Sequence, residues 1–197
     1  MHPIVHAGLL LTGGASTRMG RDKATIVAGG ASLAERAAAV LQSAARPVLA
    51  VGPAAGSGCD SVDDPRRGPL VAFDAGAEAL ATLGFDGPVI LLACDMPLVT
   101  GQMLAHLAML RRGADAVVPI AGGRLQPLCA VYAPQARVVA HGLVAGGARS
   151  MRDLLTAIRI EVAPASLFAR DGDPDPFADV DTPDDFERIA SILGAPA

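Results

Sequence analysis

The clearest buried strand that the 197-residue sequence predicts is Val89-Ile90-Leu91-Leu92-Ala93, which leads directly into Cys94-Asp95-Met96-Pro97. A short apolar run without polar alternation is typical of a strand that is covered on both faces, as in a parallel sheet between helices. Similar runs recur in both directions along the chain. Further strands are predicted at Val5–Leu11, Pro47–Val51, Ala116–Pro119, Pro127–Tyr132, Arg159–Val162 and Phe177–Val180.

Helical segments separate these strands. Ser32-Leu33-Ala34-Glu35 has the Ser-x-x-Glu form of a capping box and predicts a helix that ends near Ala44. Gly68-Pro69-Leu70 predicts the start of a helix to about Leu83. Further helices are predicted over Thr100–Arg112, Ala133–Leu143, Ser150–Thr156 and Thr182–Leu193.

This alternation predicts an α/β fold of three layers, in which a mostly parallel central sheet of Rossmann-like architecture lies between helices. The crossovers between parallel strands are expected to be right-handed. A length of 197 residues without a long linker predicts one domain over residues 1–197. In open sheets of this kind, ligands bind beyond the carboxyl ends of the strands.

The composition excludes several classes of function. The net charge is −4, and the sequence has no Trp and no basic tract, which argues against binding to nucleic acid. No apolar run is long enough to span a membrane, and the N-terminus lacks the features of a signal peptide. Cys59, Cys94 and Cys129 form no C-x-x-C pair and are interpreted as reduced thiols. The sequence therefore predicts a cytoplasmic protein that binds neither nucleic acid nor membrane.

A glycine-rich segment follows the first predicted strand and reads Leu11-Thr12-Gly13-Gly14-Ala15-Ser16-Thr17-Arg18-Met19-Gly20-Arg21-Asp22-Lys23. Adjacent glycines allow a turn whose N–H groups can surround an anion, and the three cations of the segment can neutralise phosphates. The spacing fits neither a Walker A loop nor the dinucleotide fingerprint Gly-x-Gly-x-x-Gly. The segment predicts a triphosphate site; the alternative is a glycine-rich turn with solvated Arg and Lys side chains.

Acidic residues follow two of the predicted strands. Asp95 comes at the end of the strand at Val89–Ala93, where a carboxylate can hold Mg²⁺ against phosphate oxygens or can simply form a turn. Asp179 and Asp181 are two residues apart, so an extended segment would direct both to the same side. Asp181 is the candidate second metal ligand; a helix-capping role ahead of Pro183 is the alternative.

The segment Gly13-Gly14-x-x-x-Arg18-Met19-Gly20-x-Asp22-Lys23 resembles the signature of the molybdenum cofactor guanylyltransferases, within the wider group of GT-A-like nucleotidyltransferases. The resemblance covers nearly the whole chain, and the pair Asp22-Lys23 favours the guanylyl branch over the cytidylyl branch. It continues through Asp64-Pro65, Gly68-Pro69-Leu70, Cys94-Asp95-Met96-Pro97, Gln126-Pro127-Leu128, Ala130-Val131-Tyr132 and Asp179-Val180-Asp181-Thr182-Pro183.

This resemblance implies transfer of GMP from GTP to the phosphate of molybdopterin-type molybdenum cofactor, with release of pyrophosphate and with Mg²⁺ as cofactor. Molybdoenzymes or their chaperones would receive the product. Catalytic roles are implied for Arg18, Lys23 and Asp95, and metal binding for Asp95 and Asp181. The implied nucleotide-binding residues are Leu11, Thr12, Gly13, Gly14, Lys23, Gly52, Asp64, Leu70 and Asp95, and those of the acceptor are Arg149 and Ser150.

The sequence departs from the family pattern at four places. Thr12 stands where Ala is most common, and Val71-Ala72 replaces the usual Ala-Gly pair. Gly52 stands where a polar residue often contacts the nucleoside, so a contact there would use the backbone. The stretch Gly146-Gly147-Ala148-Arg149-Ser150 lacks the Glu of the family, and Arg149 is either a phosphate ligand or a solvated residue.

Two other functions remain open at this point. One is cytidylyl transfer to the same pterin, or nucleotidyl transfer to another phosphorylated metabolite. The other is a nucleotide-binding module without catalysis. The four histidines are scattered and predict no catalytic role.

Overall fold

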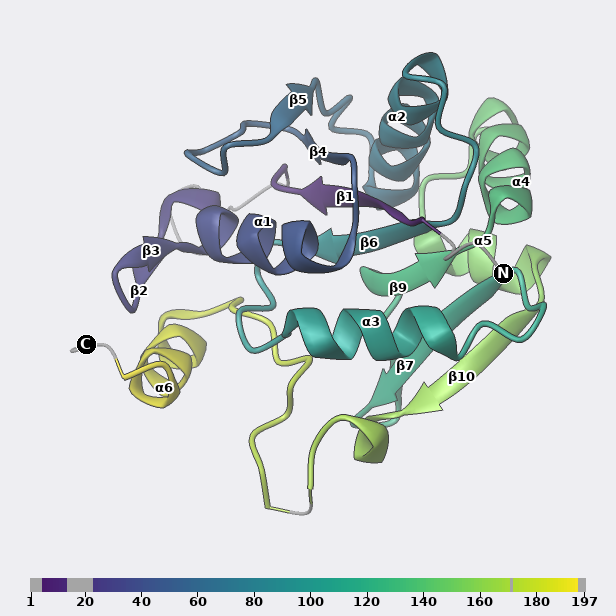
Figure 1. Cartoon of the computed structure of the whole chain (residues 1–197). Helices are drawn as coiled ribbons and strands as arrows, with labels where there is room; N and C mark the ends of the chain where they lie inside the picture. The colour runs from purple at the N-terminus through teal and green to yellow at the C-terminus, as the bar shows by residue number, and fades with distance from the viewer. Residues whose placement is uncertain (1–4, 14–22, 171, 195–197) are drawn as a thin grey trace.

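The computed structural model describes residues 5–13, 23–170 and 172–194 (Figure 1). Within these residues, the main sheet has eight strands in the order β10-β7-β9-β6-β1-β4-β5, with β8 paired to β7. The strands are β1 (Ala7–Leu11), β4 (Val48–Val51), β5 (Asp60–Val62), β6 (Val89–Ala93), β7 (Ala116–Ala121), β8 (Arg124–Leu125), β9 (Cys129–Tyr132) and β10 (Ile160–Pro164). A separate hairpin pairs β2 (Val27–Ala28) with β3 (Ala31–Ser32).

The sheet is mostly parallel, as the sequence predicts. Strand β1 lies inside the sheet and pairs in parallel with both β4 and β6, while β5 extends the parallel set on one side. Strand β9 is the exception in the middle of the sheet, because it is antiparallel to β6 and to β7. Consequently the carboxyl ends of β1, β4 and β6 meet at one edge, together with the amino end of β9.

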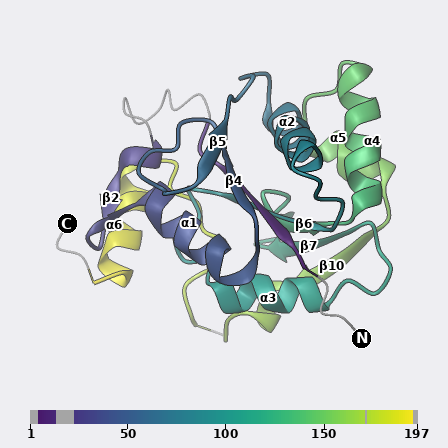
Figure 2. The same cartoon turned by 45° about the horizontal axis from the view of Figure 1, so that its top comes forward.

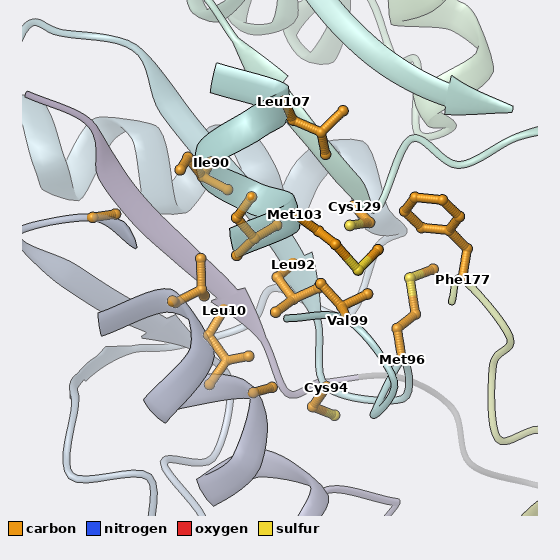
Figure 3. Close-up of a cluster of buried hydrophobic side chains, with 14 of the residues drawn as sticks. Leu10, Ile90, Leu92, Cys94, Met96, Val99, Met103, Leu107, Cys129 and Phe177 are labelled. Carbon is orange, nitrogen blue, oxygen red and sulfur yellow. The ribbon is translucent and has the colours of Figure 1, made fainter. Parts of the chain in front are cut away.

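Helices cover both faces of the sheet and complete the three layers (Figure 2). On one face lie α1 (Leu33–Ala44) and α3 (Gly101–Met109), which pack on Leu10, Ile90 and Leu92 (Figure 3). On the other face α2 (Pro69–Thr82), α4 (Pro134–Ala145) and α5 (Met151–Ala157) pack on Leu9 and Leu91. Neighbouring residues of one strand thus enter opposite cores, which is why the strands read as continuous apolar runs.

The chain closes with α6 (Pro183–Ile192), which lies beside the β2–β3 hairpin (Figure 1). Ile189 of this helix packs with Ala28, Leu33 and Val180 in a small cluster of its own. Two short 3₁₀ helices, η1 (Lys23–Thr25) and η2 (Ala165–Leu167), complete the described elements. In the described part of the chain, no helix combines the length and the apolar character needed to cross a membrane.

The predicted helix starts agree with the structure. Ser32 caps α1 in a reciprocal capping box with Glu35, Pro69 occupies the first turn of α2, and Thr182 caps α6. The predicted strand at Phe177–Val180 is wrong, because this segment forms no ladder with another strand. Its Phe177 and Val180 side chains instead enter different apolar clusters. The segment therefore crosses the edge of the sheet without joining it.

Candidate active site

A cavity of about 510 Å³ opens at the edge of the sheet where β1 and β6 end. Its walls come from four places: the carboxyl ends of β1 and β6, the loop between β5 and α2 with the start of that helix, the residue before β9, and η1. Ligand binding at this edge is the general rule for open α/β sheets. The lining residues are Leu11, Thr12, Gly13, Lys23, Asp64, Arg66, Gly68, Pro69, Ala72, Ala93, Cys94, Asp95 and Leu128.

Lys23 joins two of the predicted acidic residues at this cavity. Its Nζ donates to Asp95 Oδ2 at 3.5 Å and also to Asp181 Oδ1. The backbone holds the same arrangement, because the N–H of Val180 donates to the carbonyl oxygen of Asp95 at 2.9 Å. Residues that lie 72 and 158 positions apart in sequence thus form one ionic cluster. The structure brings together the three charged residues that the sequence assigns to catalysis and metal binding in the described part of the chain.

Burial and charge oppose each other at Asp95. Desolvation raises the pKa of its carboxyl group, the carboxylates of Asp179 and Asp181 raise it further, and the Lys23 ammonium works in the other direction. For Lys23, burial alone lowers the pKa, but the bonds to Asp181 and Asp95 outweigh it and the net pKa is raised. Lys23 therefore stays positively charged. The buried carboxylate of Asp95 needs a neighbouring positive charge to remain ionised.

One oxygen of Asp95 has no such partner. Its Oδ1 atom is buried and makes no hydrogen bond to any residue that the structure describes. A buried carboxylate oxygen is costly to leave unpaired, so this atom fits a cation ligand. No group of three or more His, Cys, Asp or Glu residues that could hold a metal occurs in the described residues. Asp95 and Asp181 thus fit a cation that takes its remaining ligands from phosphate and water, as Mg²⁺ commonly does.

The turn after β1 is built around glycines. The Oγ1 of Thr12 and the N–H of Gly13 both donate to the carbonyl oxygen of Val51, at 3.2 and 3.3 Å. A Cβ atom at Gly13 would lie 1.9 Å from Asp64 Oδ2, and one at Gly52 would lie 2.7 Å from the Gly13 nitrogen. Both positions therefore need glycine. Gly52 supports the turn from behind through its backbone and does not line the cavity.

Besides Gly52, three further predicted binding residues lie away from the cavity wall. The Leu70 side chain is buried in the core under α2, and its N–H donates to the carbonyl oxygen of Arg149 at 3.1 Å. Ser150 caps α5, where its Oγ accepts from Arg152 N at 3.0 Å. The Arg149 side chain is exposed, and its backbone contacts Gly68 at the rim. Their binding roles stay predictions, and Gly14 and Arg18 lie outside the described residues.

The structure adds Arg66 and Leu128 to the cavity wall, along with several apolar residues. Leu128 lies there because β9 runs antiparallel, so that its amino end meets the carboxyl end of β6; Ala93 N donates to Leu128 O at 2.8 Å. The sequence predicted a mostly parallel sheet without assigning a direction to β9, so it did not select Leu128 as a cavity residue. For Arg66, its place between Asp64 and Gly68 was the signal available.

Two of the three cysteines belong to the core, as expected, and Cys94 also lines the cavity. All three are free thiols, and Cys94 and Cys129 are buried. Burial raises the pKa of the Cys129 thiol to about 12, which keeps it protonated and removes it as a nucleophile. The chemistry of the cavity therefore depends on its charged groups.

Comparison with known proteins places this geometry in a family. A family model described as the MobA-like NTP transferase domain matches residues 8–162. A molybdenum cofactor guanylyltransferase from Rhizobium leguminosarum bv. trifolii is 30% identical over 201 residues, which cover 96% of this chain and 93% of the relative.

Solved structures share the fold over nearly their whole length. Molybdopterin-guanine dinucleotide biosynthesis protein A from Archaeoglobus fulgidus aligns with a TM-score of 0.77 at 23% identity, covering 95% of this chain and 98% of that one. A 2-C-methyl-D-erythritol 4-phosphate cytidylyltransferase from Thermus thermophilus aligns with a TM-score of 0.66 at 16% identity, covering 97% and 100%. These names refer to different bases, so the fold alone does not select the nucleotide. The family match over residues 8–162 and the relative at 30% identity establish that the chain is a nucleotidyltransferase of the MobA-like NTP transferase family.

Proposed function

We propose that this chain, acting as one domain over residues 1–197, transfers GMP from GTP to the phosphate of molybdopterin-type molybdenum cofactor and releases pyrophosphate. The observation that carries the proposal is the meeting of Lys23, Asp95 and Asp181 at one end of a cavity at the carboxyl edge of the sheet. The name of the Rhizobium relative supports the choice of donor and acceptor.

The reaction needs positioning and charge neutralisation more than proton transfer. An oxygen of the acceptor phosphate attacks the α-phosphorus of GTP, the bond between that phosphorus and the bridging oxygen to the β-phosphate breaks, and pyrophosphate leaves. The attacking phosphate is already ionised at neutral pH, so no general base is required. The protein's task is to hold two mutually repelling anions in line.

Lys23 is suited to this task in the structure as it stands. Its side chain is only 17% exposed, so its charge acts in a partly desolvated place where electrostatic stabilisation is strong. Two carboxylates hold the ammonium group at the cavity. We assign to Lys23 the neutralisation of charge at the α-phosphate, and to the Gly13 turn and Arg18 the binding of the remaining phosphates.

Asp95 and Asp181 are the residues that would hold Mg²⁺. The ion, when bound, supplies Lewis-acid stabilisation of phosphate oxygens. The unpaired Oδ1 of Asp95 and the two neighbouring carboxylate oxygens support this assignment. Both carboxylates keep their orientation without the ion because Lys23 already joins them.

The proposed acceptor side of the site lies at the rim of the cavity. Arg149 is exposed and lies against Gly68 at the rim of the cavity, where a guanidinium can bind the phosphate of the pterin. We propose Arg149 for that role, with Ser150 positioning it as the cap of α5. Cytoplasmic synthesis and transfer of the product to molybdoenzymes or their chaperones complete the proposal.

The test is pyrophosphate release by the purified protein with each of the four nucleoside triphosphates, with and without molybdenum cofactor. Release that requires both GTP and the cofactor is the expected result. Release with CTP would support the cytidylyl alternative. The fold shared with the Thermus cytidylyltransferase is compatible with that alternative. Binding of GTP without release under any condition would contradict the proposal and favour a non-catalytic module.

A further inference from the structure

Arg66 holds an unusual backbone conformation at the wall of the cavity. Its φ is 54°, in the left-handed region that residues with a side chain seldom adopt. Asp64 fixes this conformation, because its Oδ1 accepts from the Arg66 N–H at 2.8 Å. Left-handed residues of this kind tend to occur where a side chain must be aimed at a ligand. The neighbouring Arg67 has the same charge but does not line the cavity.

The Arg66 guanidinium is available to a ligand. The residue is exposed, and its side chain makes no hydrogen bond or ion pair with any residue that the structure describes. Of the cavity-lining residues, it and Lys23 carry the positive charges. Lys23 is held by two carboxylates, whereas Arg66 can direct all of its side-chain donors toward a bound molecule.

The two cations come from opposite sides of the sheet. Lys23 begins η1, whose Ala24 packs with α1 on one face. Arg66 precedes α2, which covers the other face. The wall between the carboxyl end of β1 and the start of α2 is apolar, formed by Leu11, Pro69, Ala72, Ala93 and Leu128. A charged phosphate gains no favourable contact from such an apolar wall, whereas a planar base can pack on it.

We propose that Arg66 recognises guanine, by donating two hydrogen bonds to the adjacent acceptors O6 and N7 of the base. Guanine offers two neighbouring acceptors, O6 and N7, to a guanidinium fork, whereas adenine offers N7 beside an amino donor. Arg66 is therefore the residue that distinguishes guanine from adenine in the donor site. The inference rests on the proposed use of GTP and adds to it how the base is selected.

The test pairs a change in the protein with a change in one atom of the ligand. GTP and 7-deaza-GTP differ at N7, and calorimetry measures the affinity of both for the wild type, Arg66→Gly and Arg66→Lys. Glycine adopts the left-handed backbone without strain, so Arg66→Gly removes the side chain and preserves the loop. Arg67→Gly is the matched control, since it removes an equal charge one residue away.

The wild type is expected to prefer GTP over 7-deaza-GTP by about tenfold, the usual effect of a hydrogen bond to a charged group. Arg66→Gly should weaken GTP binding and abolish this preference, Arg66→Lys should reduce the preference because an ammonium lacks the planar fork, and Arg67→Gly should keep it. Equal weakening of both nucleotides by Arg66→Gly would overturn the inference, because it would mean that the arginine acts through charge alone. A wild type that binds GTP and 7-deaza-GTP with equal affinity would overturn it as well.

Failure of the proposed function gives a different pattern. If the wild type releases pyrophosphate from CTP and not from GTP, the assignment of GTP as donor is wrong. The proposed recognition of guanine by Arg66 is then wrong too. If the wild type uses GTP and Arg66→Gly retains its preference for the N7 ligand, only the role of Arg66 is wrong. Pyrophosphate release and the two-ligand comparison therefore separate the two failures.

Discussion

At the scale of single residues, the charge of Lys23 is the feature on which the proposed chemistry depends most. It is the only lysine in the sequence, where every other basic side chain apart from histidine is arginine. An ammonium is a compact charge that can approach phosphate and carboxylate oxygens from any direction, whereas a guanidinium needs a planar, two-pronged partner. A position between two carboxylates and a substrate phosphate suits the lysine.

Replacing Lys23 by Ala should lower turnover by about 10²–10³-fold, the usual cost of losing one preorganised charge in a transition state. The fold should survive, since the side chain contributes to no apolar cluster. Pyrophosphate release measures the first effect, and thermal unfolding with far-ultraviolet circular dichroism measures the second. Near-normal turnover in the variant would refute the catalytic role of Lys23.

The ammonium of Lys23 also lies beside the two carboxylates that would hold the metal, so its charge repels the ion. Replacing it by Met keeps the length of the side chain and leaves Asp95 and Asp181 without their cation. Metal affinity in the absence of nucleotide should then rise by about tenfold, equivalent to about 1.4 kcal/mol. Calorimetric titration with Mg²⁺ or Mn²⁺ checks this, with Arg159→Met as a control that breaks an exposed ion pair with Asp115. Unchanged or weaker metal binding in Lys23→Met would show that the ion binds elsewhere.

Sequence reasoning found Asp95 because a carboxylate after a buried strand must lie at the ligand-binding edge of the sheet. It left Asp181 between metal binding and helix capping, and the structure decides part of that choice. Thr182 and Asp185 form the capping box of α6, and the Asp181 side chain is directed to Lys23. Arg66 was missed although it lies between Asp64 and Gly68, because no local pattern marked the left-handed backbone that it adopts at the cavity wall.

At the scale of elements, α6 links the C-terminal part of the chain to the site. Its cap fixes Asp181, since Asp185 Oδ2 accepts from the N–H groups of Asp181 and Thr182 at 3.3 and 3.0 Å. The bond to the Thr182 hydroxyl, together with Arg188 and these backbone bonds, holds the pKa of Asp185 below its usual range. The capping box thus stabilises the helix and holds the backbone of the candidate metal ligand.

Replacing Asp185 by Ala should lower the free energy of unfolding by about 1 kcal/mol at neutral pH, as loss of a capping interaction does. Because folding lowers the pKa of this group, its contribution is present above the ordinary carboxyl pKa and disappears as the pH falls through the folded-state value. Denaturant unfolding should therefore separate the wild type from the variant at pH 7 and bring them together in strong acid. Asp184→Ala, one residue away, is the control. A difference that persists unchanged in strong acid would contradict the linkage.

One wrongly predicted strand and one missed strand show that local sequence patterns do not reveal which segments pair in a sheet. The apolar residues of the segment from Phe177 to Val180 read as a strand, but they fill two separate clusters, and whether a partner strand lies alongside is a tertiary property. Strand β5 was missed for the opposite reason. Its residues Asp60 and Ser61 are polar and exposed at the edge of the sheet, Val62 is half-buried, and only pairing with β4 makes the three a strand.

At the scale of the whole molecule, the three-layer fold followed from the alternation of apolar runs and capped helices, and the structure confirms it. The direction of β9 did not follow, because a buried strand reads alike whether it runs parallel or antiparallel to its neighbours. This reversal matters for the site, since it brings Leu128 to the cavity floor beside Ala93. The cavity therefore joins elements from both helical layers across one sheet edge.

A ligand that fills this cavity should stabilise the whole molecule, because its walls belong to the η1–α1 side, the α2 side and the sheet between them. GTP with Mg²⁺ at about one hundred times its Kd should add about 2.7 kcal/mol to the free energy of unfolding. For a chain of this length, that corresponds to a rise in Tm of about 5–10 °C.

Thermal unfolding with GTP, with and without Mg²⁺, measures this effect in the wild type and in Asp95→Asn. The carboxamide of the variant keeps the shape of Asp95 and removes its charge, so the additional stabilisation by Mg²⁺ should be lost while part of that by GTP remains. An Asp153→Asn variant changes a carboxylate in the capping box of α5, outside the cavity, and should respond to Mg²⁺ as the wild type does. If Asp95→Asn keeps the full response to Mg²⁺, the metal is not held at the end of β6, and the ionic cluster at the cavity serves the lysine alone.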